Sequence, residues 1–262
     1  MKITSPDKIM FSTGITKLDI VNYYREIAKY MMPYIGGRIL SLVRCPQGVE
    51  QPCFYKKNPD NNEQYYIINT VDELIEQVQL NTIEFHTWGT QINNLDCPDI
   101  MIFDIDPGPE VRIEAIRQAA KDIQVTLKAL RLESFVKTSG NNGYHIVVPF
   151  SKTPSWEVFR DFAKNVADLL EAKHPEKYTT NIRKSARASK IFIDWLRNTK
   201  GATSVAPYSL RIKTPSISAP ISWQELDKIA PNQITMATAI KRAKKKDLWH
   251  NFFEIKATQF LK

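Results

Sequence analysis

Two aspartates at the end of an apolar stretch, Asp104 and Asp106 in residues 100–107, are the clearest chemical signal in the sequence. Side chains alternate along a strand, so both carboxylates would share one face while Phe103 and Ile105 take the buried face. Neighbouring carboxylates repel each other unless a cation lies between them. A metal-binding pair, and a pair of Asp side chains that cap the next helix, both fit this stretch on its own.

The elements expected after this stretch decide what lies beside the two aspartates. Hydrophobic periodicity predicts a strand at 100–106, a helix at 110–131, strands at 134–138 and 144–149, a helix at 155–172 and a strand at 191–196. This β-α-β-β-α-β order is the split unit of ferredoxin-like folds. Right-handed crossovers place the third strand beside the first and the fourth on its other side, so both neighbours run antiparallel to the first.

The two helices of this unit carry apolar stripes at helical spacing, and the stripes predict which faces pack on the sheet. The stripe of the first helix consists of Ile113, Ile116, Ala120, Ile123, Leu127 and Leu130. The stripe of the second helix consists of Val158, Phe162, Val166 and Leu169.

This topology brings chemically active side chains from three strands to one sheet face. Asp104 and Asp106 end the first strand. His145 begins the third strand, and Asp194 lies at a similar level of the fourth. Three carboxylates on one face destabilise each other unless divalent cations bind them through their oxygens. The link Ser-Gly-Asn-Asn-Gly at 139–143 lies at the same end, where its backbone N–H groups could bind phosphate, so the unit predicts metal-assisted nucleotidyl transfer.

The composition is that of an ordinary globular protein with a basic excess. The chain has 262 residues, 43% hydrophobic and 24% charged, enough for one large domain or two small ones. Lys and Arg number 36 against 28 Asp and Glu, and the net charge of +8 favours polyanions such as nucleic acid as partners.

No apolar run approaches the roughly 20 residues of a membrane span, and no signal-peptide pattern is present at the N-terminus. Cys45, Cys53 and Cys97 form no C-x-x-C pair, which predicts reduced thiols in a cytosolic protein without structural zinc.

The N-terminal part of the chain is expected to contain further helices and strands. The pattern predicts a helix from Thr16 that is ended by Pro33 and the Gly36-Gly37 pair, a strand at 38–44, a polar loop at 61–64 and a helix at 71–78.

Two short segments carry weaker signals for nucleic-acid contact. The adjacent rings of Phe54 and Tyr55, followed by two lysines, suit base stacking together with phosphate contact. One buried ring, one exposed ring and a solvated charge pair are the commoner interpretation of such a segment. A solvated helix face is likewise the commoner interpretation of the basic run at 241–246.

Three motifs resemble those of the archaeo-eukaryotic primase superfamily: Phe-Asp-Ile-Asp-Pro-Gly at 103–108, Thr-Ser-Gly-Asn-Asn-Gly-Tyr-His at 138–145 and Phe-Ile-Asp-Trp at 192–195. The sequence is most similar to the polymerase (primase-polymerase) domain of DNA ligase D, used in prokaryotic non-homologous end joining. The similarity extends over nearly the whole chain and includes segments 7–8, 14–17, 48–52, 86–88 and 206–211.

The resemblance implies the fold and its division. It implies an α/β (α+β) primase-polymerase fold, in which an RRM/ferredoxin-like β-α-β-β-α-β catalytic sheet packs against an N-terminal α/β subdomain. Residues 1–262 would form one primase-polymerase domain. Within it, residues 1–95 would be the N-terminal subdomain with the DNA-end contacts, and residues 96–262 the catalytic subdomain.

The resemblance also implies a role for each matching residue. The metal-binding catalytic carboxylates would be Asp104, Asp106 and Asp194, with Mn²⁺ or Mg²⁺ as the cofactor. The nucleotide-binding residues would be Ser139, His145, His86, Arg187 and Arg211. Lys8 and Lys17 would bind a DNA 5′-phosphate, and Phe54 with Tyr55 would stack at the template break. Many relatives have a Lys where this chain has Asn142, so one cation toward the triphosphate is absent here.

The function implied is a template-directed nucleotidyltransferase that favours ribonucleotides, fills gaps and extends ends during double-strand break repair. Its partners would be DNA ends and gapped DNA with a 5′-phosphate, NTP or dNTP, Ku and a DNA ligase, in the cytoplasm and away from membranes. A metal-dependent nuclease is one alternative, which would need the same carboxylates but neither the 139–143 loop nor Arg211. A catalytically silent RRM-like nucleic-acid-binding module is another, and it would carry aromatic residues where this sheet face has Asp.

Overall fold

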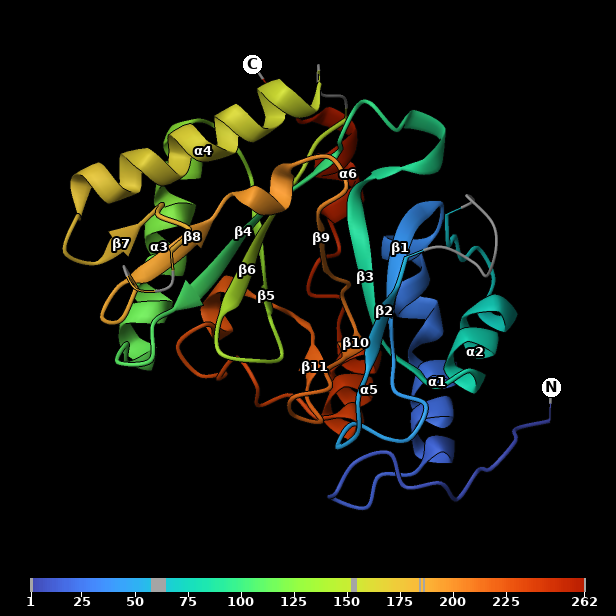
Figure 1. The fold of residues 1–262 in the computed structure, drawn as a ribbon. Helices are drawn as coiled ribbons and strands as arrows, with labels where there is room; N and C mark the ends of the chain where they lie inside the picture. The colour runs from blue at the N-terminus through green and yellow to red at the C-terminus, as the bar shows by residue number, and fades with distance from the viewer. Residues whose placement is uncertain (1, 58–64, 152–154, 184, 186, 262) are drawn as a thin grey trace.

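The computed structural model describes residues 2–57, 65–151, 155–183, 185 and 187–261, and two main sheets organise them (Figure 1). The predicted polar loop at 61–64 lies outside these residues. The described α-helices are α1 (Lys17–Ile35), α2 (Val71–Gln79), α3 (Ile113–Ala129), α4 (Trp156–Lys173), α5 (Met236–Lys245) and α6 (Phe252–Thr258).

The first sheet contains mainly N-terminal strands and is antiparallel throughout. Its strands in spatial order are β2 (Phe54–Lys56), β1 (Arg38–Arg44), β3 (Thr82–Gln91) and β9 (Thr203–Val205). A small sheet of β10 (Ser209–Leu210) and β11 (Ile217–Ser218) lies nearby (Figure 1). The predicted boundary at residues 95 and 96 stays a prediction, and β9 joins this sheet from beyond it.

The second sheet contains the predicted β-α-β-β-α-β unit. Its strands in spatial order are β12 (Pro220–Ile221), β5 (Phe135–Thr138), β6 (Tyr144–Pro149), β4 (Ile100–Pro107), β8 (Ile191–Asp194) and β7 (Tyr178–Thr179). The third strand of the unit, β6, and the fourth, β8, flank β4 on opposite sides and run antiparallel to it. The predicted topology is therefore confirmed.

The two faces of the second sheet are covered differently. Met101 and Phe103 of β4 are fully buried in the main core, on the face where α3 and α4 pack. On the opposite face, Ile102 is covered by Trp249 and by Phe252 of α6. Asp104 and Asp106 follow on that second face at the far end of β4, where the apolar cover ends.

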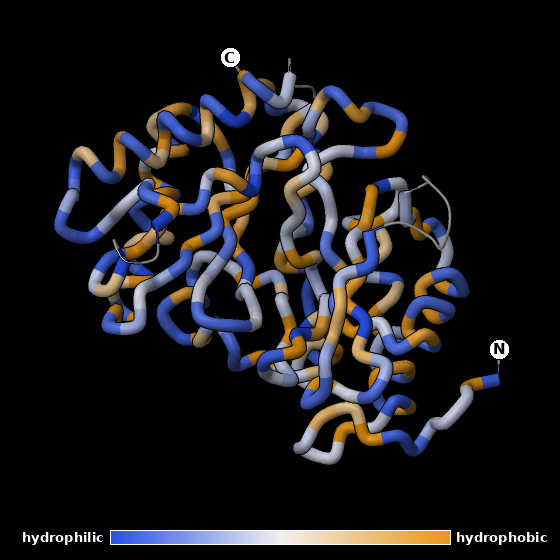
Figure 2. The backbone as a smooth tube through the Cα atoms, in the orientation of Figure 1, coloured by the Kyte–Doolittle hydropathy of each residue, from blue (hydrophilic) through white to orange (hydrophobic). Residues whose placement is uncertain are grey.

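The buried face of α4 differs from the predicted stripe. Val158 and Leu169 are 47% and 56% exposed, whereas Phe159 and Leu170 are buried. The rotation of the helix is fixed by Trp156, whose indole Nε1 donates a hydrogen bond to the Leu95 carbonyl at 2.7 Å. Hydrophobic and hydrophilic residues alternate along α4 in Figure 2, so the sequence is compatible with more than one buried face of this helix. In α3 the last predicted stripe residue, Leu130, is the C-cap and is also exposed.

Helix α1 ends at Ile35 with Gly36 as its C-cap, as the Gly36-Gly37 pair predicted, but it continues past Pro33. Thr16 and Asp19 form a capping box at its start, as the sequence suggested. Pro33 lies inside the helix, which reaches Ile35 because a proline in the last turn removes only one hydrogen bond. In the part of the chain that the structure describes, no helix combines the length and apolar character needed to cross a membrane.

Two of the cysteines form a disulfide, which corrects the prediction of reduced thiols. Cys45 and Cys53 flank the turn between β1 and β2. Because Arg44 pairs with Phe54, the Cα atoms of the two cysteines lie 4.4 Å apart. The sequence spacing gave no sign of this pairing, because it depends on how the turn folds back. Disulfides are uncommon in the cytosol, so the thiol argument for a cytosolic protein no longer applies.

Alkylation measures this disulfide directly. When the non-reduced protein is denatured and treated with iodoacetamide, mass spectrometry should find one modified cysteine, Cys97, because the other two sulfurs are bonded to each other. After reduction with dithiothreitol all three should be modified. Modification of all three without a reductant would contradict the Cys45–Cys53 pairing.

Candidate active site

The predicted carboxylates meet where β4, β6 and β8 lie side by side. Asp104 is in register with His145 on one side and with Asp194 on the other. Asp106 lies two residues further along β4, with its side chain 59% exposed. The strand register thus brings together the four residues that the topology predicted.

Two arginines compensate the negative charge of these carboxylates. Arg197 Nε lies 3.3 Å from an oxygen of Asp104 and 3.2 Å from an oxygen of Asp194. Arg187 Nη1 lies 3.1 Å from Asp106, and its guanidinium stacks 3.7 Å above the Phe192 ring centroid. Arg187 contacts Asp106 in this structure, and its predicted role in nucleotide binding stays a prediction. Arg197 was missed, although its position three residues after Asp194 was a usable signal.

Burial and mutual repulsion shift the pKa values of the carboxyl groups in different directions. Burial raises the pKa of Asp194 to about 6, against the opposing charge of Arg197. Burial and the charge of Asp104 raise the pKa of Asp106. Burial also opposes ionisation of Asp104, but His145 and then Arg197 hold its pKa well below the usual range. The cluster therefore favours any cation that enters it.

The donor set fits a hard divalent cation, since carboxylate oxygens are the ligands that Mg²⁺ and Mn²⁺ prefer. In the described residues, no group of three or more His, Cys, Asp or Glu side chains already has the arrangement of a metal site. Arg197 lies between Asp104 and Asp194, and its guanidinium supplies the positive charge there. The carboxylates thus fit a metal in chemistry and in strand register, with an arginine as their present counter-ion.

His145 is held by Asp104. Its Nε2 lies 3.2 Å from Asp104 Oδ1, and burial, together with the charge of Lys137, lowers its pKa to about 4. The ring is therefore neutral at pH 7 and donates its Nε2 proton to the carboxylate. Among the described residues, the buried Nδ1 has no hydrogen-bond partner. His145 also lines the adjoining cavity, although its Nδ1 is itself buried.

The 139–143 loop is closed by its own serine. Ser139 Oγ accepts hydrogen bonds from the N–H groups of Asn141 at 3.1 Å and of Gly143 at 3.2 Å. A Cβ on Gly143 would lie 1.9 Å from the Ile105 carbonyl oxygen, so only glycine lets the loop lie against β4. Ser139 is 7% exposed and shapes the loop, and two of the amides expected to bind phosphate are already satisfied by it.

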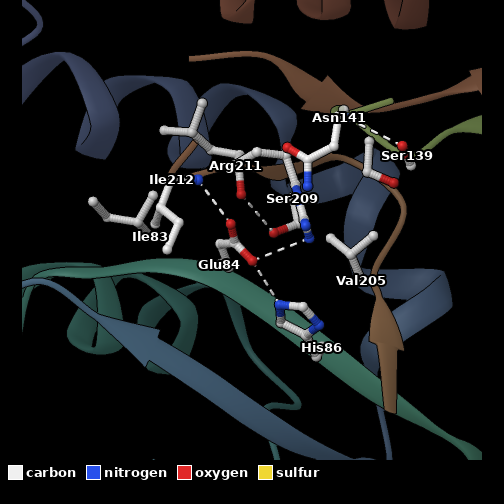
Figure 3. Close-up of polar contacts among 12 residues, drawn as sticks. Ile83, Glu84, His86, Ser139, Asn141, Val205, Ser209, Arg211 and Ile212 are labelled. Atoms are coloured by element: carbon white, nitrogen blue, oxygen red, sulfur yellow. Dashed lines mark hydrogen bonds and ion pairs between the residues drawn. The ribbon is translucent and has the colours of Figure 1, made fainter. Parts of the chain in front are cut away.

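A buried glutamate joins two of the predicted nucleotide contacts, His86 and Arg211. Figure 3 shows the Glu84 carboxylate of β3 between the His86 ring and the Arg211 guanidinium. Its Oε2 lies 2.7 Å from His86 Nε2 and 3.0 Å from Arg211 Nη1. With the Asn141 amide turned so that both ends find partners, its oxygen accepts from Arg211 Nη2 at 2.5 Å. Glu84 was missed, although it lies two residues before His86 and therefore on the same strand face.

One cavity of about 510 Å³ collects most of these groups. The predicted residues that line it are Tyr55, His86, Asp104, His145 and Arg211, together with Arg197. The other predicted metal and nucleotide residues are not part of its described lining: Asp106, Asp194, Ser139 and Arg187.

The two predicted phosphate-binding lysines lie next to each other. The Lys17 N–H donates to the Lys8 carbonyl at 2.8 Å, and the Lys8 ammonium contacts the Pro46 carbonyl. Burial, and then the charge of Lys8, lowers the pKa of Lys17. Lys17 is only 4% exposed, with its ammonium 3.4 Å from Thr4 Oγ1, and an anion such as a 5′-phosphate would relieve the repulsion between the two lysines.

Phe54 and Tyr55 are both exposed, at 46% and 61%. The commoner interpretation, with one ring buried, is therefore wrong, because β2 is a short edge strand that leaves both of its faces open. The Tyr55 ring lies 5.8 Å from the His86 ring and lines the cavity, whereas Phe54 does not.

Comparison with known proteins identifies the family. The model of the LigD primase-polymerase domain matches residues 16–249. The chain belongs to this family. A solved structure of the polymerase domain from Mycobacterium tuberculosis ligase D in complex with DNA is similar to it, with a TM-score of 0.88 over 99% of both chains and 29% identity. The predicted primase-polymerase fold is thus confirmed.

Curated relatives are similar over most of the chain. A multifunctional non-homologous end joining protein LigD of Mycolicibacterium smegmatis is 32% identical over 86% of this chain and 32% of its own length. The LigD of Pseudomonas aeruginosa is 30% identical over 87% of this chain and 29% of its own length. The bifunctional LigD of Bacillus subtilis is 28% identical over 94% of this chain and 43% of its own length. The chain therefore spans between 29% and 43% of the length of these relatives.

Loss of Arg197 tests whether a divalent ion can take its place. Arg197→Ala leaves Asp104 and Asp194 without a shared counter-ion and should cost about 1–3 kcal/mol of stability in metal-free buffer. Mn²⁺ should restore the melting temperature, because the carboxylates then bind the ion. Arg160→Ala, which removes an exposed pair with Asp161, is the control. An equal response of both variants to Mn²⁺ would argue against a metal site here.

Proposed function

We propose that this chain is a template-directed nucleotidyltransferase that fills gaps and extends DNA ends during double-strand break repair by non-homologous end joining. The observation that carries the proposal is the register of Asp104 with Asp194 and His145, beside a cavity that also exposes Arg211. Nucleotidyl transfer requires carboxylates that bind metal ions and, close to them, cationic side chains that bind the phosphates. The DNA bound to the mycobacterial neighbour supports a DNA substrate for this chain.

The chain's own residues would divide the work as follows. Asp104, Asp106 and Asp194 would hold Mn²⁺ or Mg²⁺, which when bound activates the attacking hydroxyl and stabilises charge on the phosphates. Arg211 would bind the triphosphate, since its fork matches phosphate oxygens. His145 would contact the same ligand from the wall of the cavity.

The DNA end would be bound outside the second sheet. Lys8 and Lys17 would bind the 5′-phosphate of the downstream strand, and Phe54 and Tyr55 would stack on the exposed template base. Ku and a DNA ligase are proposed partners, because end joining needs both end recognition and sealing. Bacterial DNA lies in the cytoplasm, which is the proposed location.

The alternatives are less well supported by the site. A silent RRM-like module would carry aromatic residues on the sheet face, where β4, β6 and β8 instead present Asp104, His145 and Asp194. A nuclease would have no need of Arg211 fixed beside the 139–143 loop.

Primer extension on gapped DNA tests the proposed activity. Wild type should extend the primer with Mn²⁺, and more readily with ribonucleotides than with deoxynucleotides. Asp104→Ala and Asp106→Ala should each abolish extension with an unchanged circular dichroism spectrum, because both remove a proposed metal ligand. Asp96→Ala, which removes an exposed partner of Lys200, should behave as wild type. Near-wild-type extension by either active-site variant would sink the assignment.

Binding to gapped DNA with and without a 5′-phosphate tests the lysine pair. Wild type should prefer the phosphorylated end, and the preference should weaken with salt because it is ionic. The double variant Lys8→Ala with Lys17→Ala should lose the preference while it keeps basal binding. If the preference persisted there and disappeared instead in Lys241→Ala with Lys245→Ala, the 5′-phosphate site would lie at the basic run.

A further inference from the structure

Both oxygens of the buried Glu84 carboxylate, beside the cavity, have partners. The residue is 2% exposed, and its two oxygens have three partners. Oε1 accepts the Ile212 N–H at 2.7 Å, while Oε2 contacts His86 at 2.7 Å and Arg211 at 3.0 Å. Burial would raise the pKa of Glu84, but these partners lower it overall, so the group is ionised.

The contact with Glu84 fixes the proton of His86. A carboxylate can only accept, so the His86 Nε2 carries a hydrogen and donates it. Burial lowers the pKa of His86 and favours the neutral ring, which leaves Nδ1 without a proton. In the described residues Nδ1 has no hydrogen-bond partner, and Figure 3 shows it turned away from Glu84. His86 therefore presents an acceptor nitrogen on the side of the ring away from Glu84.

The same carboxylate fixes the direction of Arg211. The guanidinium is held at Nη1 by Glu84 and at Nη2 by the Asn141 oxygen, and the side chain is only 14% exposed. The stem is also confined, since a Cβ on Gly140 would lie 2.5 Å from Arg211 Cγ. An arginine held at both ends of its fork has already lost most of its rotamer freedom before a ligand arrives.

We propose that Glu84 is a positioning residue for the incoming nucleotide, acting through Arg211 and His86 and not through contact of its own. This rests on the proposed function, because it assigns the 510 Å³ cavity to a nucleotide. Glu84 comes from β3, whereas Asn141 comes from the loop after β5, so the network also fixes the first sheet relative to the second.

Glutamine at this position would reverse both effects at nearly equal volume. With its oxygen on the Ile212 N–H, the amide nitrogen would face the Arg211 guanidinium, donor against donor. The same nitrogen would donate to His86 Nε2 and move the ring proton to Nδ1. Glu84→Gln therefore removes the positioning while it keeps the side-chain shape.

Steady-state extension kinetics test the role. Glu84→Gln should raise the KM for nucleotide about tenfold, as for one lost charge-assisted contact, with kcat changed less than about threefold. Glu225→Gln is a matched control, since Glu225 also pairs with an arginine at 3.0 Å, and the variant should leave KM unchanged. A KM for Glu84→Gln within about twofold of wild type would overturn the proposal.

A double variant shows whether Glu84 acts through Arg211. Arg211→Ala should raise the KM about ten- to a hundredfold. Glu84→Gln should add less than about threefold in that background, because only the contact with His86 remains for Glu84 to act through. Fully additive effects would show that Glu84 acts elsewhere and would overturn the proposal.

The His86 tautomer is read in the wild-type protein, so a variant that fails to fold does not affect the result. Long-range ¹H–¹⁵N spectra of ¹⁵N-histidine-labelled protein resolve four rings, and His86 is assigned with His86→Gln. The spectrum at pH 7 should show Nε2–H and an unprotonated Nδ1, and the opposite tautomer would overturn the proposal. This measurement needs no polymerase activity. A wild type that fails to extend primers would therefore reject the proposed function, whereas the tautomer reports the contact of Glu84 with His86 independently of it.

Discussion

The balance of charge between Asp104, Asp194 and Arg197 is the interaction on which the site depends. Directly opposed residues on antiparallel strands have Cβ atoms about 4.5–5.5 Å apart, so two carboxylates at such a pair destabilise the sheet. Arg197 offsets that repulsion, because the turn after β8 places its guanidinium next to one oxygen of Asp104 and one oxygen of Asp194. The turn is anchored in β4, where the buried Asn198 side chain accepts the Ile102 N–H and donates to the Ile102 carbonyl, both at 2.8 Å.

The site lies where the two main sheets meet, and buried polar groups connect them. Lys137 of β5 is fully buried and donates to the Val205 carbonyl of β9 at 2.9 Å and to Ser218 Oγ at 2.7 Å. Burial, and then Arg211, lowers the pKa of Lys137 well below its usual range. Its hydrogen bonds join the second sheet to a strand of the first. Glu84 makes a second connection through Arg211 and Asn141.

Two positions of the 139–143 loop depend on glycine. At Gly140 the backbone φ is +71°, a region that side chains with a Cβ rarely adopt, and the Arg211 stem fills the space beside it. At Gly143 the β4 carbonyl of Ile105 fills that space instead. The two glycines of the loop therefore serve close approach, one to an arginine and one to a strand. This restricts the loop more tightly than its turn-forming composition alone would.

The sequence by itself determined the order of the elements in the second sheet and which residues share a face. Period-two alternation in β4 and right-handed crossovers were enough to bring Asp104, His145 and Asp194 together. The family motifs carried the proposed roles, including those of Lys8 and Lys17. These inferences hold because strand alternation and crossover handedness depend on local geometry.

Only the tertiary structure decided which charges pair and which faces are buried. Glu84 and Arg211 are far apart in sequence, as are Asp106 and Arg187, and no spacing rule indicates such contacts. The α4 face was set by Trp156 meeting Leu95, and the Cys45–Cys53 bond by the fold of one turn. Ion pairs, helix rotation and disulfides form between groups that approach only when the chain is packed. Their energies depend on burial and distance, which a linear pattern does not contain.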